Sequence, residues 1–318
     1  MKSILPDQYA VEKQFNSRVD NFFAKYEISK KLRCCNFQKT KGFSCLEIFK
    51  FIFLLVFSAK NLYRTLQSEA DSGMPQKDTI YRFLNSCRYN WRKFLLTLSS
   101  TIIKETIEPL KPHSWKNVLI LDDSLYSRNR SKAVELLARV RDHVEHKYVL
   151  GFRMLTLGWS DGNTFLPVAF SLLSSENEHN RLCGINQRLD KRTTGYKRRM
   201  ESIKKSTEVM FDLLRQAQEQ GIKARYLLFD SWFAFPAIIC KVREHHLHVI
   251  CMLKSMKKVL YTYKGEKMNL DTLYKELLKK PGKAKILANA SVVIGNDSNG
   301  NPVPARILFV RDPNRSKK

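Results

Sequence analysis

Two short apolar runs end in the same way, and this repetition constrains the fold more than any other feature of the chain. Residues 118–121 read VLIL and lead into Asp122-Asp123-Ser124, and residues 226–229 read YLLF and lead into Asp230-Ser231. Apolar runs of this length are typical of buried strands. A carboxylate that directly follows such a strand lies at the rim of the sheet, where it is exposed but rigidly held. If the two strands are neighbours, Asp123 and Asp230 meet in space.

The pattern around these runs predicts an α/β domain over residues 113–257. Residues 160–163 (SDGN) are typical of a hairpin turn between the second and third strands. The predicted order is three strands, a helix, a strand, a helix and a strand. The strands are expected at 118–121, 148–159, 164–173, 226–229 and 248–253, and the helices at 201–220 and from Pro236 onward.

The paired acids indicate a particular chemistry. Two facing carboxylates repel each other, and a divalent cation relieves that repulsion; hard oxygen ligands favour Mg²⁺ or Mn²⁺. Such ions can activate a nucleophilic oxygen and stabilise the leaving oxygen of a phosphodiester. The other interpretation is that each Asp only caps a turn or a helix. Trp232 and Phe233 follow the second acid, and we expect them in the core, with base stacking as the alternative.

The charge of the chain indicates its partner. The sequence holds 56 Lys and Arg against 30 Asp and Glu, a net charge of +26. An excess of this size favours a polyanion, nucleic acid first and an anionic membrane surface second. The longest apolar run, residues 51–57, is too short to span a bilayer. The cysteines form no Cys-x-x-Cys pair, so we expect a reduced, cytoplasmic protein without a membrane partner.

One stretch concentrates the positive charge. Residues 181–205 hold nine Lys and Arg and two acidic residues. Arginine can fork onto phosphate oxygens and lysine supplies compact charge, so this stretch is expected to lie along DNA. The alternative is a solvated charge run without a partner. The predicted DNA contacts are Lys191, Arg192, Lys197, Arg198, Arg199 and Lys204.

The first third of the chain, residues 1–112, is predicted to be helical. Pro75 is the one proline between residues 7 and 108, and apolar residues recur three and four apart. The break at 72–75 (SGMP) is followed by a short amphipathic helix over 77–84 that carries Lys77 and Arg82. A helix, a turn with Gly and a helix with a basic start fit a helix-turn-helix that reads DNA. A plain packing helix is the alternative interpretation.

Four blocks of the chain resemble the DDE insertion-sequence transposases. They are LDDS at 121–124, GFRMLTLGWSDG at 151–162, DKRTTGYKRR at 190–199 and FDSWF at 229–233. The resemblance implies an RNase H-like mixed sheet with flanking helices and a β-rich insertion. It implies a transposase that cleaves and transfers strands of double-stranded DNA at element ends, with Mg²⁺ or Mn²⁺ and as a homodimer on DNA. It also implies a nucleoid-associated protein of a bacterium or archaeon.

The resemblance assigns the acidic residues. The first acidic position falls on Asp123, directly before the hydroxyl residue, and the second on Asp230; both would be catalytic and would hold the metal. Asp122 is assigned as a neighbour that tunes the site, although a swap of roles between Asp122 and Asp123 is open.

The third acid of the family, a Glu on a helix beyond the insertion, has no match in the chain. Residues 258–311 are predicted to be the insertion itself, with a strand at 259–264, a helix at 270–280 and strands at 285–295 and 303–311 that pair around Asn299-Gly300. We therefore predict an incomplete copy, with a helical domain over 1–112, a catalytic core over 113–257 and the insertion over 258–318. Such a chain would bind DNA and cleave it poorly. The alternatives are a non-cleaving fragment that inhibits the complete transposase and an RNase H-like nuclease of another lineage.

Overall fold

The computed structural model describes residues 8–57, 61–68, 73–112, 114–142, 145–279 and 285–311. Its first part is helical, as predicted, and the predicted helix over 77–84 is confirmed as α5. A long rod runs from α6 through a π-helical turn, η1 (Ile103–Ile107), into a 3-10 turn, η2 (Glu108–Leu110). The helices are α1 (Gln8–Lys25), α2 (Ile28–Cys34), α3 (Cys45–Phe57), α4 (Leu62–Ser68), α5 (Lys77–Leu84) and α6 (Trp91–Ile102).

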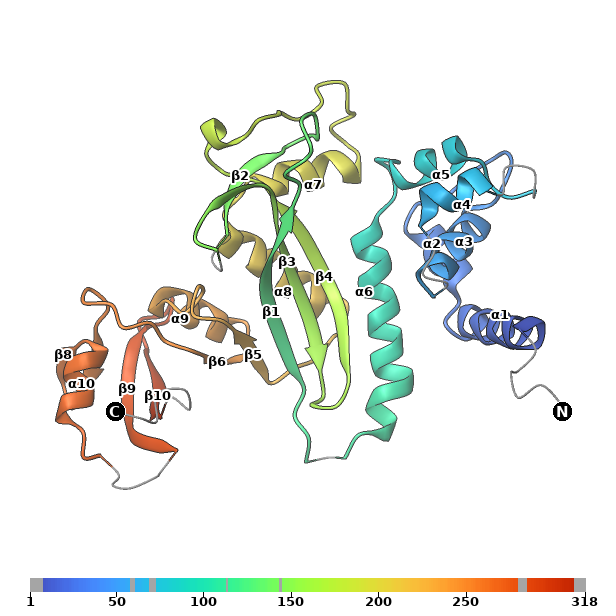
Figure 1. The fold of residues 1–318 in the computed structure, drawn as a ribbon. Helices are drawn as coiled ribbons and strands as arrows, with labels where there is room; N and C mark the ends of the chain where they lie inside the picture. Colours follow the sequence, from blue (N-terminus) through green and yellow to red (C-terminus); the bar gives the residue numbers. More distant parts are fainter. Residues whose placement is uncertain are drawn as a thin grey trace, which may run out of the picture.

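The helical part has its own core, which is rich in aromatic side chains. Phe37 lies in contact with Tyr89 and Trp91, with ring centroids 4.5 Å and 4.6 Å apart, and Phe83 of α5 packs against the same group. Stacked and edge-on aromatic pairs of this kind add to the stabilisation that burial provides. In Figure 1 this core lies on one side of α6, and the sheet of the next part lies on the other side.

A mixed sheet follows, and its topology confirms the RNase H-like α/β class. Its strands are β1 (Val118–Ser127), β2 (Ala138–Arg141), β3 (Tyr148–Ser160), β4 (Phe165–Leu173), β5 (Tyr226–Phe229) and β6 (His248–Cys251). The order is β2-β3-β1-β5-β6, with β4 also paired to β3. The pairs β1/β3 and β3/β4 are antiparallel, whereas β1/β5 and β5/β6 are parallel. The two runs that end in Asp are therefore direct neighbours.

The first strand is longer than its apolar run predicts. It continues through Asp122, Asp123 and Ser124 to Ser127, because β3 pairs with it along its whole length, from Val118 opposite Ser160 to Ser127 opposite Gly151. A strand that one neighbour pairs completely keeps its backbone hydrogen bonds whatever side chains it carries. The aspartates thus lie inside the strand and alternate between its two faces.

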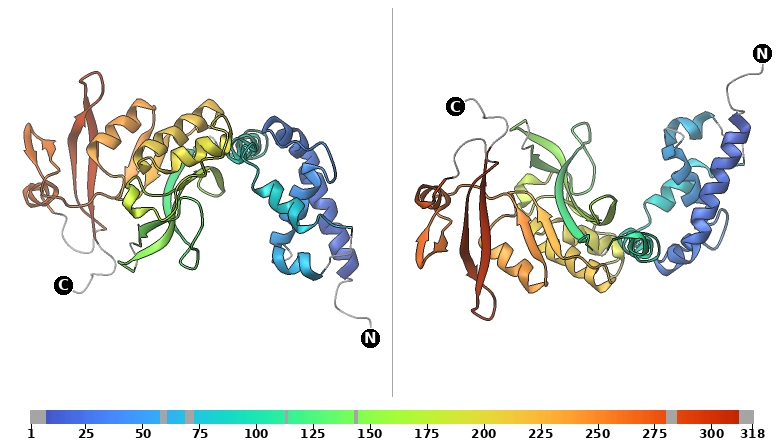
Figure 2. Two further views of the ribbon diagram at one scale, coloured as in Figure 1. Left: turned by 90° about the horizontal axis from the view of Figure 1, so that it is seen from above. Right: turned by 90° about the horizontal axis from the view of Figure 1, so that it is seen from below.

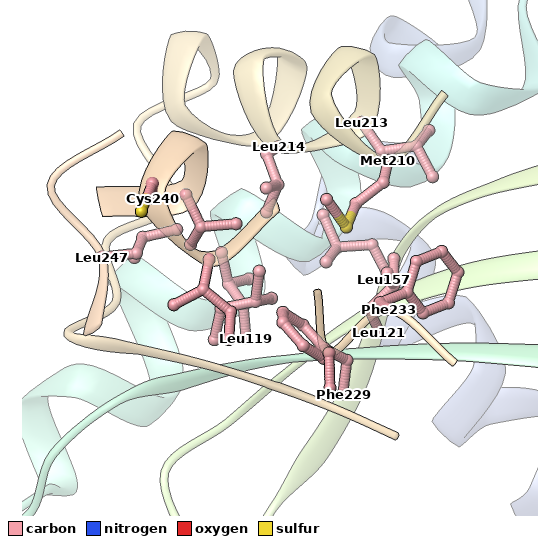
Figure 3. Close-up of a cluster of buried hydrophobic side chains, with 14 of the residues drawn as sticks. Leu119, Leu121, Leu157, Met210, Leu213, Leu214, Phe229, Phe233, Cys240 and Leu247 are labelled. Atoms are coloured by element: carbon pink, nitrogen blue, oxygen red, sulfur yellow. The ribbon is translucent and has the colours of Figure 1, made fainter. Parts of the chain in front are cut away.

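Two helices cover one face of the sheet. α8 (Ser206–Glu219) and α9 (Pro236–Glu244) lie on the same side, as Figure 2 shows. Figure 3 shows Met210, Leu213 and Leu214 of α8 directed at the inner-face side chains of the strands. The predicted helix over 201–220 is α8, which begins at Ser206; a separate helix, α7 (Thr194–Ser202), precedes it within the basic stretch and was not predicted. On the opposite face, Ile250 of β6 is largely exposed.

The last part is the predicted β-rich unit. It contains β7 (Tyr261–Tyr263), β8 (Glu266–Met268), α10 (Leu270–Glu276), β9 (Ile286–Asn296) and β10 (Pro302–Val310). The strands form an antiparallel sheet in the order β10-β9-β7-β8. Gly300, with a φ of +82°, and Asp297, whose carboxylate accepts the backbone N–H of Asn299, close the hairpin between β9 and β10. β9 packs against α9, which ties this unit to the mixed sheet. The boundaries of the three units remain predictions.

Among the helices that the structure describes, none is long and apolar enough to cross a bilayer.

Candidate active site

The register of the two central strands brings Asp122 and Asp230 to the same level of the sheet. The parallel pairing of β1 and β5 ends with Leu121 opposite Phe229, and the next residues are Asp122 and Asp230. Leu121 and Phe229 are both buried against the helices, whereas Asp122 and Asp230 are exposed. Successive side chains of a strand point to opposite faces, so Asp122 leaves β1 on the face that α8 and α9 do not cover.

Local hydrogen bonds hold both of these carboxylates. Ser124 Oγ donates to Asp122 Oδ2 over 2.5 Å, across the two-residue spacing that puts both side chains on one face. Asp230 Oδ1 accepts the backbone N–H of Trp232 over 2.9 Å, an Asx turn that fixes the carboxylate where the chain leaves β5. Each bond orients its carboxylate through one oxygen.

Asp123 lies in a different environment, because it is the next residue of the same strand. Its side chain is only 6% exposed and forms an ion pair with Arg153 of β3, whose Nε lies 2.9 Å from each carboxylate oxygen. Asp123 is paired with Leu155 across the strands and Arg153 with Leu125, so the two charged residues are diagonal neighbours on one face. A carboxylate this well buried needs such a partner.

Trp232 and Phe233 separate in the structure. Phe233 is fully buried beneath the turn and packs edge-on against Phe229, as predicted for a core residue. Trp232, by contrast, is 44% exposed, so the expectation that it belongs to the core is wrong. Arg153 Cζ lies 6.0 Å and Lys254 Nζ 5.7 Å from the centre of its ring. Residue type alone does not tell which of two consecutive aromatic side chains in a turn is buried and which is exposed.

A third acidic ligand is not brought to this edge within the described ranges. There, no three His, Cys, Asp or Glu side chains come close enough together to hold a metal ion. The donors at the rim are carboxylate oxygens, which suit a hard divalent cation such as Mg²⁺ or Mn²⁺.

The predicted basic stretch divides into two kinds of residue. Lys191 and Lys197 are exposed, and no ion pair holds either of them among the described residues. Arg192 is exposed and paired with Asp190 over 3.0 Å, which holds the pKa of Asp190 at about 2. Lys204 lies 3.5 Å from Asp212. These four side chains are available to an anionic partner.

Arg198 and Arg199 instead form ion pairs within the protein. Arg198 Nη1 donates to Glu201 over 2.6 Å, and Arg199 Nε to Glu135 over 2.7 Å. Glu201 also binds Arg92 of α6 through both guanidinium Nη atoms, and Arg92 is only 3% exposed. Burial alone raises the pKa of Glu201, but the hydrogen bonds and charges of Arg92 and Arg198 outweigh it and lower the pKa. This network joins the helical part to the mixed sheet, because Glu201 also accepts a hydrogen bond from Ser171 of β4.

The candidate helix-turn-helix has its basic residues on the surface. Both Lys77 and Arg82 of α5 are exposed. Lys77 Nζ lies 5.9 Å from the ring centre of Tyr63 in α4, and Arg82 Nε donates to the carbonyl of Asp78 over 3.2 Å. Residues 69–72, which include the start of the predicted break, lie outside the described residues. The role of this pair in reading DNA remains a prediction.

Comparisons with known proteins identify a family whose model covers more than half of the chain. Residues 54–270 match the model of a family described as DDE superfamily endonuclease. Among solved structures, the chain is similar to the transposase of the Drosophila P element strand transfer complex, with 12% identity and a TM-score of 0.34, over 83% of this chain and 55% of that one. The chain thus spans about half the length of that transposase, and a similarity this low carries no argument about mechanism. No curated protein matches the chain.

Proposed function

Because the chain belongs to the DDE superfamily of endonucleases, we propose that it cleaves and transfers DNA strands in transposition. Water would be the first nucleophile and a freed 3′-hydroxyl the second. The observation that carries this proposal is the register of β1 and β5, which ends with Leu121 opposite Phe229 and is followed on both strands by an exposed aspartate.

In this proposal, Asp122 and Asp230 hold the divalent cation. The resemblance assigned the first position to Asp123, and the alternation of β1 is the reason to exchange the two neighbours. Asp123 is committed to Arg153, whereas Asp122 is exposed on the open face beside Ser124. A carboxylate that binds both a guanidinium and a cation would have to give up one of them.

The protein would contribute position and charge. Mg²⁺ or Mn²⁺, when bound, activates the attacking oxygen and stabilises the leaving oxygen of the phosphodiester. The Asx turn holds the Asp230 carboxylate at the strand end, and Ser124 orients that of Asp122. The parallel pairing of β1 with β5 fixes the level of the two aspartates relative to each other.

We further propose that DNA lies along the exposed basic side chains. Lys191, Arg192, Lys197 and Lys204 would contact phosphates, and Lys77 and Arg82 of α5 would contact a second segment of duplex. Pairing of two element ends would require two copies of the chain on DNA, as the resemblance to the transposases implies.

Cleavage of the DNA that flanks the gene tests this function directly. We expect weak Mg²⁺- or Mn²⁺-dependent nicking at the element ends by the purified chain, because no cluster of three acidic, His or Cys ligands forms among the described residues, and a further large reduction in Asp230→Asn. DNA binding by that variant should be unchanged. Nicking that persists in Asp230→Asn, or that needs no metal, would contradict the proposal. Binding without cleavage by the unaltered chain would favour a role as an inhibitor of a complete transposase.

A further inference from the structure

A second basic segment lies at the same edge of the sheet as the proposed cation site. β5 and β6 are parallel, and their pairing ends with Phe229 opposite Cys251, so the chain that leaves β6 begins level with Asp230. Lys254 follows, and its Nζ lies 5.7 Å from the ring centre of Trp232. The backbone N–H of Trp232 in turn donates to Asp230 Oδ1. The basic segment therefore begins directly beside the aspartate.

A tight turn presents two further lysines in this segment. The backbone N–H of Val259 donates to the carbonyl of Met256 over 3.1 Å, which closes a β-turn. Lys257 and Lys258 are the two central residues of the turn, and both are exposed. Leu253 and Val259, on either side, pack against the main hydrophobic core. The backbone that carries the lysines is thus held in place before any ligand binds.

The charges of this segment are not balanced within the protein. Residues 245–265 hold four lysines and no acidic residue. Among the residues that the structure describes, no carboxylate forms an ion pair with Lys254, Lys257 or Lys258. A charge run is often only solvated surface. Here, however, three like charges lie within five residues on a fixed backbone, and a polyanion relieves their mutual repulsion.

The two basic segments lie on opposite sides of the proposed cation site. Lys191 and Lys197 belong to the stretch around α7, which packs against β4. β4 pairs with β3, and the sheet continues in the order β3-β1-β5-β6. Asp122 on β1 and Asp230 after β5 therefore lie between α7 and the chain that leaves β6. Figure 1 shows α7 above β4, with β6 on the other side of β1. Four strand spacings, about 19 Å, separate β4 from β6.

We propose that Lys254, Lys257 and Lys258 bind DNA phosphates on the side of the scissile phosphate opposite to Lys191 and Lys197. One duplex then crosses the rim of the sheet. The identity of the ligand as DNA rests on the proposed function, whereas the place of the contact rests on the strand order and the turn. Four residues span at most about 14 Å, so the Cα atoms of Lys254 and Lys258 lie within about four nucleotides of one strand. The three lysines act as positioning residues.

The salt dependence of binding in EDTA tests this contact separately from cleavage. The probe is a fluorescein-labelled 16-bp duplex, which is about 54 Å long and can reach both basic segments. In Lys257→Ala/Lys258→Ala, the slope of log K against log salt concentration should be reduced by about 1.8, which corresponds to two lost phosphate contacts. The matched control, Lys116→Ala/Lys223→Ala, removes two exposed lysines that precede β1 and β5, at the opposite end of the parallel strands, and should keep the slope.

The number of duplexes bound per chain tests whether one duplex spans both segments. It is measured by titration at protein concentrations far above Kd. The unaltered chain and Lys257→Ala/Lys258→Ala should bind the same number, and adding Lys191→Ala and Lys197→Ala should reduce the slope by about 1.8 more. A halved number in Lys257→Ala/Lys258→Ala would indicate two separate duplexes and would overturn the inference, as would an unchanged slope. A reduced slope without any metal-dependent nicking by the unaltered chain would overturn only the proposed function.

Discussion

Arg153 Nε lies 2.9 Å from both carboxylate oxygens of Asp123, whereas the adjacent Asp122 is exposed and bonded to Ser124. Two consecutive aspartates thus have opposite environments because they lie on a strand, where neighbours point to opposite faces. One is held inside the protein by a guanidinium, and the other reaches the open rim beside Asp230. The division of roles that we propose for this site follows from that difference.

Arg153→Ala should destabilise the protein, because it leaves the nearly buried carboxylate of Asp123 without its partner. We expect a loss of about 2–3 kcal/mol in the free energy of unfolding, measured by urea denaturation at pH 7. The matched control is Arg192→Ala, which breaks an ion pair with Asp190 at the surface. Its effect should be much smaller, because this pair is exposed to solvent. Equal effects of the two variants would show that the Asp123 pair is no more than a surface contact.

The network around Glu201 should make part of the stability depend on pH. Its pKa is lowered in the folded protein from an ordinary value of 4.5, so the ionised form stabilises the fold above that value. The contribution is lost as the pH falls below about 4.5 and through the lower pKa of the folded state. Glu201→Gln should cost about 3 kcal/mol at pH 7, because the buried Arg92 loses its carboxylate.

Urea denaturation of the unaltered chain and of Glu201→Gln at pH 7 and at pH 3.5 measures this dependence. The difference in unfolding free energy between the two proteins should be smaller at pH 3.5. A difference that is the same at both values would mean that the Glu201 carboxylate does not stabilise the junction between α6, β4 and α7 through its charge.

The exposed lysines of the basic stretch should determine the salt dependence of DNA binding. Each phosphate contact that is lost should reduce the slope of log K against log salt concentration by about 0.9 for duplex DNA. Lys191→Ala and Lys197→Ala should each show this reduction in a fluorescence anisotropy titration, without loss of stability. Lys275→Ala provides the control, because α10 lies at the far end of the molecule from α7 in Figure 1. An unchanged slope in both lysine variants would contradict the proposed path of the DNA.

Local sequence patterns are sufficient to predict part of this fold. The order of the five predicted strands, α5 at Lys77–Leu84 and the hairpin around Asn299-Gly300 follow from apolar periodicity and turn residues, which are local properties. β2 and α7 were not predicted. The hypothesis that β1 and β5 are adjacent strands is confirmed by their parallel pairing. The sequence also contained the information about which face Asp122 lies on. Leu119, Leu121 and Asp123 are spaced two residues apart and share the buried face of the strand, so Asp122 lies on the other face.

Other features depend on contacts between distant residues, which a single sequence does not display. The length of β1 depends on its pairing with β3, and the use of Arg198 in an ion pair depends on Glu201 and Arg92, which come from α7 and α6. The sequence alone does not distinguish a basic residue that binds DNA from one that binds a buried carboxylate. The exposure of Trp232 beside the buried Phe233 is likewise decided by the turn that Asp230 forms.

The binding of Mn²⁺ by the purified chain tests the central assignment most directly, because it needs neither the DNA sequence nor cleavage. Water proton relaxation, titrated with Mn²⁺, measures the affinity in the unaltered chain and in Asp122→Asn, Asp123→Asn and Asp230→Asn. We predict that Asp122→Asn and Asp230→Asn each weaken binding by at least about tenfold, equal to about 1.4 kcal/mol, and that Asp123→Asn stays within about twofold. Loss of binding in Asp123→Asn together with full binding in Asp122→Asn would contradict the account.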